Sequence, residues 1–183
     1  MIPIRDVIPT RTTPFVVLAF IVTNVLFLTY AAVALRPTRG LLVYFLLTAL
    51  FMWIFGENVE DRTDHGRFLM LLLVSGAAAA IAQMATGDGP DPRLAAVGGA
   101  TAGVMGAYIT LYPKSLIVTL VPLIVTVKVI ELPAMYFLPA WFVLQWSAGT
   151  LPAHLAAFAV GMVGVLALRR RERLNVEWWV GVR

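Results

Sequence analysis

Residues 14–35 read PFVVLAFIVTNVLFLTYAAVAL, and Asn24 is the one strongly polar side chain among these 22 residues. A lipid bilayer has a hydrocarbon core of roughly 30 Å, which a helix of about 20 apolar residues can cross. No small-residue cleavage signature of the A-x-A type follows the stretch, so it does not resemble a removable signal peptide. The stretch therefore predicts a transmembrane helix.

Five more apolar runs follow along the chain, separated by short clusters of charged residues, glycine and proline. They cover residues 41–55, 68–84, 94–112, 132–146 and 151–168. Residues 113–127 are apolar and rich in β-branched side chains but too short to span, so an interfacial or re-entrant elbow is expected there. The runs predict an all-α membrane protein with six transmembrane helices.

The composition agrees with a membrane protein and excludes several kinds of site. Hydrophobic residues make up 60% of the chain and charged residues 13%, and the mean hydropathy of +0.86 is too high for a soluble domain. The chain has no cysteine, which excludes disulfides, thiolate metal sites and a cysteine nucleophile. We expect no cofactor and no metal.

The basic residues predict the orientation in the membrane. The chain divides into a tail of residues 1–13, a membrane domain of residues 14–168 and a basic tail of residues 169–183. Basic residues gather in the tails and in the connections expected on the same side as the tails. Because cytoplasmic connections carry the excess of Lys and Arg, both termini are predicted to be cytoplasmic.

The basic tail also predicts a contact surface. Anionic lipid is the expected partner, and nucleic acid is not, because the basic cluster directly follows an apolar helix. Two tryptophans beyond the cluster are expected in the headgroup layer, with a contact to a partner protein as the alternative. The residues of this lipid interface are Arg169, Arg170, Arg171, Arg173, Trp178 and Trp179.

Residues 53–68 read WIFGENVEDRTDHGRF, and three later segments carry further motifs. These are GVMGAYITLYPK at 103–114, ELPA at 131–134 and AHLAAFAVG at 153–161. Together they resemble bacterial rhomboids over nearly the whole chain. The resemblance implies a six-helix bundle with cytoplasmic termini in a bacterial inner membrane. It also implies the family's chemistry, intramembrane hydrolysis by a serine and a histidine, helped by a histidine and an asparagine at the oxyanion.

The family's site residues carry over only in part. Alignment on the fourth-helix glycines places Gly98 at the position of the serine, so that position has no nucleophile. Tyr44 and Thr48 stand at the positions of the oxyanion histidine and asparagine. His154 stands at the position of the catalytic histidine, where a neutral imidazole bonded to a carbonyl or water is expected, with a role in binding a ligand, a proton or a cofactor as the alternative. We therefore expect no catalytic residues at this degenerate site.

Small residues recur on the fourth and sixth apolar runs. Gly99, Gly103 and Gly106 lie on one face of the fourth, and Ala157 and Gly161 lie on the sixth. Small side chains let helix backbones approach closely in lipid. We expect these faces to pack against each other within the bundle, and dimerisation through them is the alternative.

Three functions remain open at this point. The first is a non-catalytic rhomboid, a pseudoprotease that binds transmembrane segments of other proteins. The second is an accessory structural subunit of a larger respiratory, photosynthetic or secretory membrane complex. The third is an active intramembrane protease that uses a displaced hydroxyl such as Thr101 or Ser147.

Overall fold

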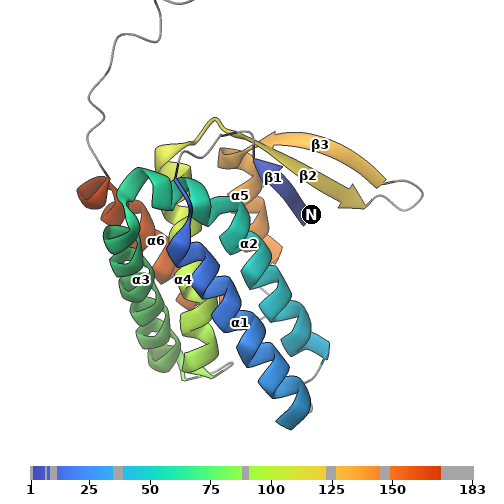
Figure 1. Ribbon diagram of the computed structural model, residues 1–183, viewed down its shortest axis with the longest axis vertical. Coiled ribbons are helices and arrows are strands. Elements are labelled where there is room, and N and C mark those ends of the chain that lie inside the picture. Colours follow the sequence, from blue (N-terminus) through green and yellow to red (C-terminus); the bar gives the residue numbers. More distant parts are fainter. Residues whose placement is uncertain are drawn as a thin grey trace, which may run out of the picture.

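The computed structural model describes residues 2–6, 8, 12–34, 39–87, 91–122, 127–144 and 149–169 (Figure 1). Within these residues, six helices and three short strands make up the fold. In chain order they are β1 (Ile2–Asp6), α1 (Phe15–Ala34), α2 (Arg39–Thr63), α3 (His65–Thr86), α4 (Pro92–Leu111), β2 (Leu116–Pro122), β3 (Val127–Pro133), α5 (Ala134–Leu144) and α6 (Leu151–Leu168).

The predicted number of six helices is confirmed, and most of the predicted boundaries are close. The run at residues 151–168 coincides with α6. The run at 41–55 is too short, because α2 continues as a helix of 25 residues through the charged segment that ends at Thr63. The run at 132–146 is too long, because its first residues belong to β3 and α5 has 11 residues. Within the described residues, four helices are long and apolar enough to cross a membrane: α2, α3, α4 and α6.

The prediction of an elbow at residues 113–127 was wrong. That part of the chain contains β2, which forms an antiparallel hairpin with β3 and pairs on its other edge with β1. The β-branched side chains suit extended backbone, and two strands from this segment can satisfy each other's backbone groups. The all-α description is therefore incomplete. Within the tail predicted at residues 1–13, Ile2–Asp6 forms an edge strand of this sheet.

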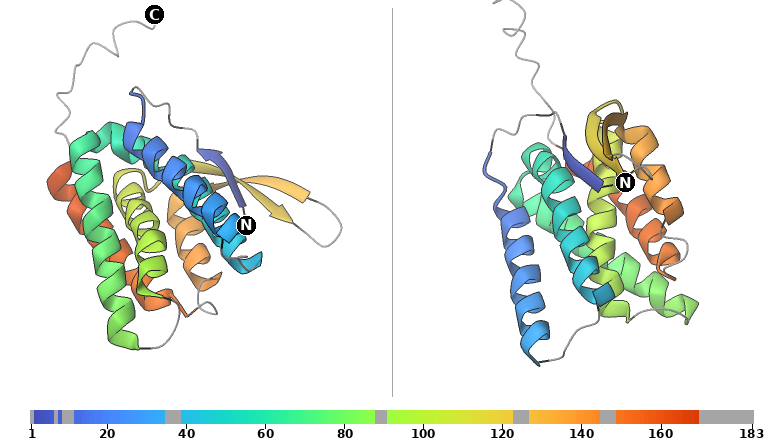
Figure 2. Two further views of the ribbon diagram at one scale, coloured as in Figure 1. Left: turned by 60° about the horizontal axis from the view of Figure 1, so that its bottom comes forward. Right: turned by 90° about the vertical axis from the view of Figure 1, so that its right-hand side faces the viewer.

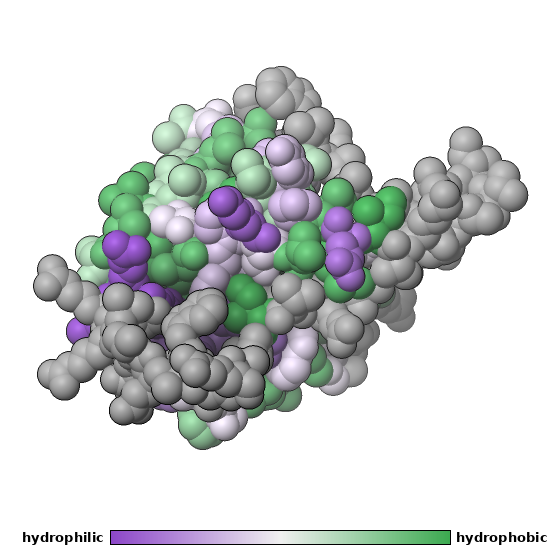
Figure 3. Space-filling view, turned by 90° about the horizontal axis from the view of Figure 1, so that it is seen from above, coloured by the Kyte–Doolittle hydropathy of each residue, from purple (hydrophilic) through white to green (hydrophobic). Residues whose placement is uncertain are grey.

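Helix α4 is the central element of the bundle. It packs against α2, α3, α5 and α6, and most of its side chains are buried. Helix α1 lies along α2 at one edge of the bundle, and the sheet projects beside α5 and the end of α2 (Figures 1 and 2). This end of the bundle carries hydrophilic residues among apolar ones (Figure 3).

Glycines set the distance between α4 and its neighbours. A Cβ added to Gly161 on α6 would collide with the backbone of Gly103 on α4. A Cβ on Gly106 would collide with the backbone of Phe158, and one on Gly99 with the Ala79 side chain while lying 3.5 Å from Ala157 Cβ. The small residues of α4 and α6 thus lie at an internal helix contact, where backbone meets backbone without intervening side chains.

Large apolar side chains cover the outward faces of the helices. Exposed examples lie on α1, α3 and α6, and they include Leu26, Leu73, Ile81, Val163 and Leu166. A soluble monomer rarely exposes so large a contiguous apolar surface. In a bilayer the same side chains face lipid tails, which is the environment that the hydropathy of these helices requires.

Candidate functional site

Three helices bring Tyr44, Gly98 and His154 together at the end of the bundle away from the sheet. Tyr44 lies in the second turn of α2, Gly98 in the second turn of α4 and His154 in the first turn of α6. All three helices begin at this end. Positions separated by more than a hundred residues in the sequence therefore converge on one point, and we name these three residues the Gly98 site.

Gly98 lies against both of the other residues. A Cβ added to Gly98 would collide with the Tyr44 hydroxyl and would lie 2.8 Å from His154 Nε2. The Tyr44 hydroxyl donates a hydrogen bond of 2.6 Å to the Leu94 carbonyl oxygen. The phenol of Tyr44 thus occupies the space in which a serine side chain at position 98 would begin.

His154 is 98% buried, and its ring is held from two sides. Its Nδ1 lies 2.8 Å from the Thr150 carbonyl oxygen. A carbonyl oxygen only accepts, so Nδ1 carries the proton and the neutral ring keeps an acceptor lone pair on Nε2. Trp141 of α5 packs on the imidazole edge to face, with ring centroids 5.8 Å apart. The acceptor nitrogen of His154 is therefore oriented toward position 98, where glycine offers no hydroxyl.

The hydroxyls near this site are engaged elsewhere or unpaired. Thr48 donates to the Tyr44 carbonyl oxygen of its own helix at 2.8 Å. Thr101 is buried, and within the described part of the chain its hydroxyl has no hydrogen-bond partner, His154 included. Ser147 lies outside the described residues. Tyr44 and Thr48 therefore have no proton free for an oxyanion in this arrangement, because each has a single O–H and donates it to a carbonyl.

Aromatic side chains join α5 to α2 beside the Gly98 site. Phe51 of α2 lies 5.3 Å from Trp141 and 6.3 Å from Phe137, measured between ring centroids. Phe55 lies 6.2 Å from Phe137. We name Phe51, Phe55, Phe137 and Trp141 the α2–α5 aromatic contact. It fills the space between α2 and α5 with rings of which three are buried, and Trp141 continues it to His154.

A polar cluster forms at the opposite end, where the WIFGENVEDRTDHGRF motif ends α2 and begins α3. The buried carboxylate of Glu60 accepts hydrogen bonds from the backbone N–H groups of Val16 and Val17, both at 2.9 Å. His65 Nδ1 lies 2.6 Å from the same carboxylate. Glu60 thereby satisfies the unpaired N–H groups at the start of α1, where negative charge is favourable.

The same motif holds two more helix ends. The Asp64 side chain accepts from the His65 N–H and caps α3, and the Asp64 backbone has a φ of 90°. Arg67 donates to the Leu168 carbonyl oxygen at the end of α6 at 3.2 Å. The motif therefore connects α1, α3 and α6. Its role in this structure is to hold helix ends together.

Several residues of these sites were not predicted from the sequence. Trp141, Thr150 and the Leu94 carbonyl hold the Gly98 site, and Glu60 anchors α1. The one available signal was Glu60, an acidic residue in the charged segment that follows a long apolar run. Among the described residues, no three His, Asp or Glu side chains are grouped so that they could hold a metal ion.

Of the predicted lipid interface, one residue falls within the description. Arg169 is exposed and follows α6, and its backbone N–H donates to the Val165 carbonyl oxygen at 2.8 Å. The other residues predicted for this interface, Arg170, Arg171, Arg173, Trp178 and Trp179, lie outside the described residues.

Comparison with known protein families matches residues 40–171 to the rhomboid domain. The match covers α2 to α6 and includes the Gly98 site and the motif at residues 53–68. The same comparisons found no match among curated proteins and none among solved structures. Family and apolar helices together make the chain an integral, multi-pass membrane protein. The chain belongs to the rhomboid family.

Proposed function

We propose that this chain is a non-catalytic rhomboid that binds transmembrane segments of other membrane proteins without cleaving them. One observation carries the proposal: the Tyr44 hydroxyl occupies the space at Gly98 where the family's serine would project. A peptide carbonyl that entered this site would meet a tyrosine already bonded to Leu94.

The chemistry of acyl transfer supports the same reading. A serine protease needs a hydroxyl within reach of a base and donors for the negative oxygen that develops. His154 presents an acceptor nitrogen, but Gly98 supplies no hydroxyl. The hydroxyls of Tyr44 and Thr48 donate to backbone carbonyls. The base remains while the nucleophile and the oxyanion donors are lacking, which favours binding over hydrolysis.

The α2–α5 aromatic contact offers the route by which a transmembrane segment would reach the site. Aromatic rings, rather than small residues, hold α5 against α2. Three of these rings, Phe51, Phe55 and Phe137, belong to the buried core, so a path from the lipid would open by repacking them while α4 and α6 stay in place. The core itself is fixed by the backbone contact of Gly103 with Gly161. A binding segment would then lie between Trp141 and the Gly98 site.

The proposal is tested by photo-crosslinking in the native membrane. A photoreactive amino acid replaces Tyr136, which is exposed on α5, or Val163, which is exposed on α6 and serves as the control. We expect position 136 to yield crosslinks whose peptides map to transmembrane segments of single-pass or multi-pass proteins, and position 163 to yield at least fivefold fewer. Equal crosslinking at both positions would argue against the proposal.

Purification in mild detergent separates the remaining functions. Substoichiometric recovery of several membrane proteins supports client binding. Recovery of one partner in fixed ratio would assign the chain instead to a larger membrane complex as an accessory subunit. Labelling of the purified protein by a fluorophosphonate at a serine or threonine would show an active hydrolase with a displaced nucleophile and overturn the proposal.

A further inference from the structure

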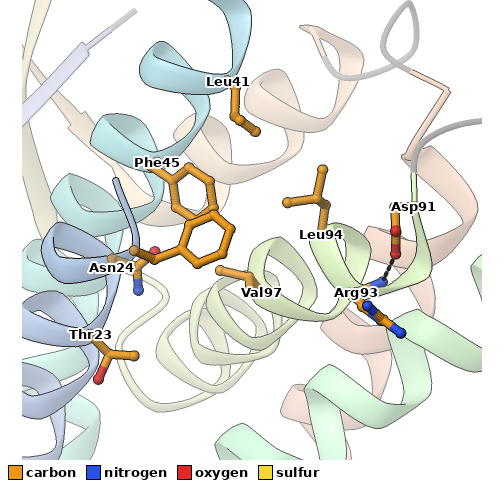
Figure 4. A pocket seen from close by; sticks show the side chains of 9 residues that line it. Thr23, Asn24, Leu41, Phe45, Asp91, Arg93, Leu94 and Val97 are labelled. Atoms are coloured by element: carbon orange, nitrogen blue, oxygen red, sulfur yellow. Dashed lines mark hydrogen bonds between the residues drawn. The ribbon is translucent and has the colours of Figure 1, made fainter. Parts of the chain in front are cut away.

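A cavity of about 410 Å³ lies between α1, α2 and α4. Its walls are formed by side chains of these three helices (Figure 4). Asn24 of α1 lies on one side of the cavity, and Leu94 and Val97 of α4 lie across from it (Figure 4). The lining residues are Thr23, Asn24, Phe27, Leu41, Phe45, Asp91, Arg93, Leu94 and Val97.

Most of the wall is apolar and shaped by aromatic rings. Phe27 of α1 and Phe45 of α2 pack with ring centroids 5.1 Å apart. Leu41, Leu94 and Val97 complete the apolar lining. Such a wall accommodates the hydrocarbon part of a ligand, and it gives no orientation to what it binds.

Two polar residues of α1, Thr23 and Asn24, line the cavity, and Asn24 is the buried one. Its side chain is 94% buried, and its Nδ2 donates to the Phe20 carbonyl oxygen at 2.8 Å. Within the described part of the chain, its Oδ1 has no hydrogen-bond partner. An unpaired acceptor in the hydrocarbon region is unfavourable, and acyl chains carry no donor that could satisfy it. A ligand with an O–H or N–H group at this depth would satisfy it.

The mouth of the cavity carries both signs of charge. Asp91 and Arg93 lie at the start of α4, where an Asp91 carboxylate oxygen accepts from the Arg93 backbone N–H at 2.7 Å. One carboxylate and one guanidinium leave the rim without net charge. The rim therefore favours a neutral ligand over a phospholipid with an anionic headgroup.

The size of the cavity distinguishes a small molecule from a protein segment. Small-molecule sites in proteins typically enclose about 300–1,000 Å³, and this cavity falls within that range. A transmembrane helix has a diameter of about 10–12 Å with its side chains and needs a groove along its whole length. The volume between Asn24 and Val97 fits a single small amphiphile.

We propose that this cavity binds a neutral membrane amphiphile with a free hydroxyl group. The hydroxyl donates to Asn24 Oδ1, and the apolar part packs between Phe45 and Val97. A monoacylglycerol and a fatty alcohol share this chemistry. The inference does not depend on whether the chain binds transmembrane segments, because it rests on Asn24 and the walls around it.

The test uses the purified full-length protein in phosphatidylcholine nanodiscs and a monoacylglycerol with a photoreactive diazirine in its chain. We expect labelled peptides from the cavity walls, competition by unlabelled monoacylglycerol and by a long-chain fatty alcohol, and no competition by the corresponding methyl ethers. If only the monoacylglycerol or only the fatty alcohol competes, that compound identifies the class of amphiphile that supplies the hydroxyl group. Asn24→Leu is expected to reduce cavity labelling at least fivefold, and Val97→Phe is expected to abolish it by filling the space.

Thr29→Val is the matched control. Thr29 lies on α1 outside the cavity lining, is exposed and donates to the Val25 carbonyl oxygen of its own helix, so its loss removes a polar group without touching the site. Labelling of this variant should equal that of the unaltered protein. Three outcomes would each overturn the proposal. The Asn24→Leu variant is labelled as strongly as the unaltered protein, the methyl ethers compete, or the labels spread evenly over the outer faces of the helices.

Discussion

The hydroxyl of Tyr44 stands in the space that a side chain at Gly98 would occupy, and it is held there by the Leu94 carbonyl oxygen. Tyr44 and Gly98 are therefore matched: the phenol fits because the glycine has no Cβ. The same match means that a serine cannot be restored at position 98 by one substitution without a steric conflict.

Gly98→Ser should lower stability and should not create a protease. Replacing a glycine inside a helix by another residue typically stabilises the folded state by about 0.5–1 kcal/mol. Overpacking against Tyr44 costs about 1–3 kcal/mol of folding free energy, so the net effect of the substitution is destabilising. The thermal unfolding midpoint in mild detergent measures it. The matched control is Gly66→Ser, because a Cβ at Gly66 meets no atom within 4 Å.

The double variant Tyr44→Ala with Gly98→Ser should lose less stability than the sum of the two single variants. Removal of the phenol makes room for the serine, and residues in contact typically couple by about 0.5–3 kcal/mol. The measurement is the free energy of unfolding of the unaltered protein, the two single variants and the double variant, which together form a double-mutant cycle. Strict additivity would mean that Tyr44 does not occupy the space at Gly98.

Glu60→Ala should destabilise the protein by about 2–4 kcal/mol, because it leaves the Val16 and Val17 N–H groups without an acceptor in a buried place. Asp61→Ala is the control. Its carboxylate accepts from the exposed Thr12 hydroxyl, a bond that contributes little in contact with water. Denaturant unfolding followed by tryptophan fluorescence compares the two, and equal losses would contradict the anchoring role of Glu60.

Gly161→Ala should destabilise the bundle by about 1–3 kcal/mol, because the new methyl group meets the Gly103 backbone, which cannot move without separating α4 from α6. Gly164→Ala provides the control on the same helix. Its Cβ would lie 3.0 Å from the end of the Leu71 side chain, which can rotate. A loss at Gly164 as large as that at Gly161 would rule out a specific backbone contact.

Single cysteines should report the orientation directly, since the chain has none of its own. With both termini cytoplasmic, cysteine at Arg93 is accessible to a membrane-impermeant maleimide in intact cells. Cysteine at Gly66 or at Lys114 reacts only after permeabilisation. All three positions are exposed in the structure, so access depends on the side of the membrane. The reverse pattern would invert the predicted orientation.

The sequence predicted which residues form the Gly98 site but not the contacts that these residues make. The motif spacing placed glycine at the serine position and Tyr44 and His154 at two other family positions. It gave no indication that Tyr44 would donate to Leu94, or that Trp141 would pack on His154. Those contacts join α2 to α4 and α5 to α6, and hydropathy contains no information on which side chains meet across helices.

By itself the sequence determined the membrane environment, the six helices and the absence of a serine at position 98, because hydropathy and residue identity are local properties. Only the tertiary structure decided that Ile2–Asp6 pairs with β2, that Glu60 anchors the start of α1 and that Asn24 faces a cavity. The physical reason is that strand pairing and buried hydrogen bonds satisfy polar groups from distant parts of the chain. Which donors and acceptors find each other depends on how the helices pack.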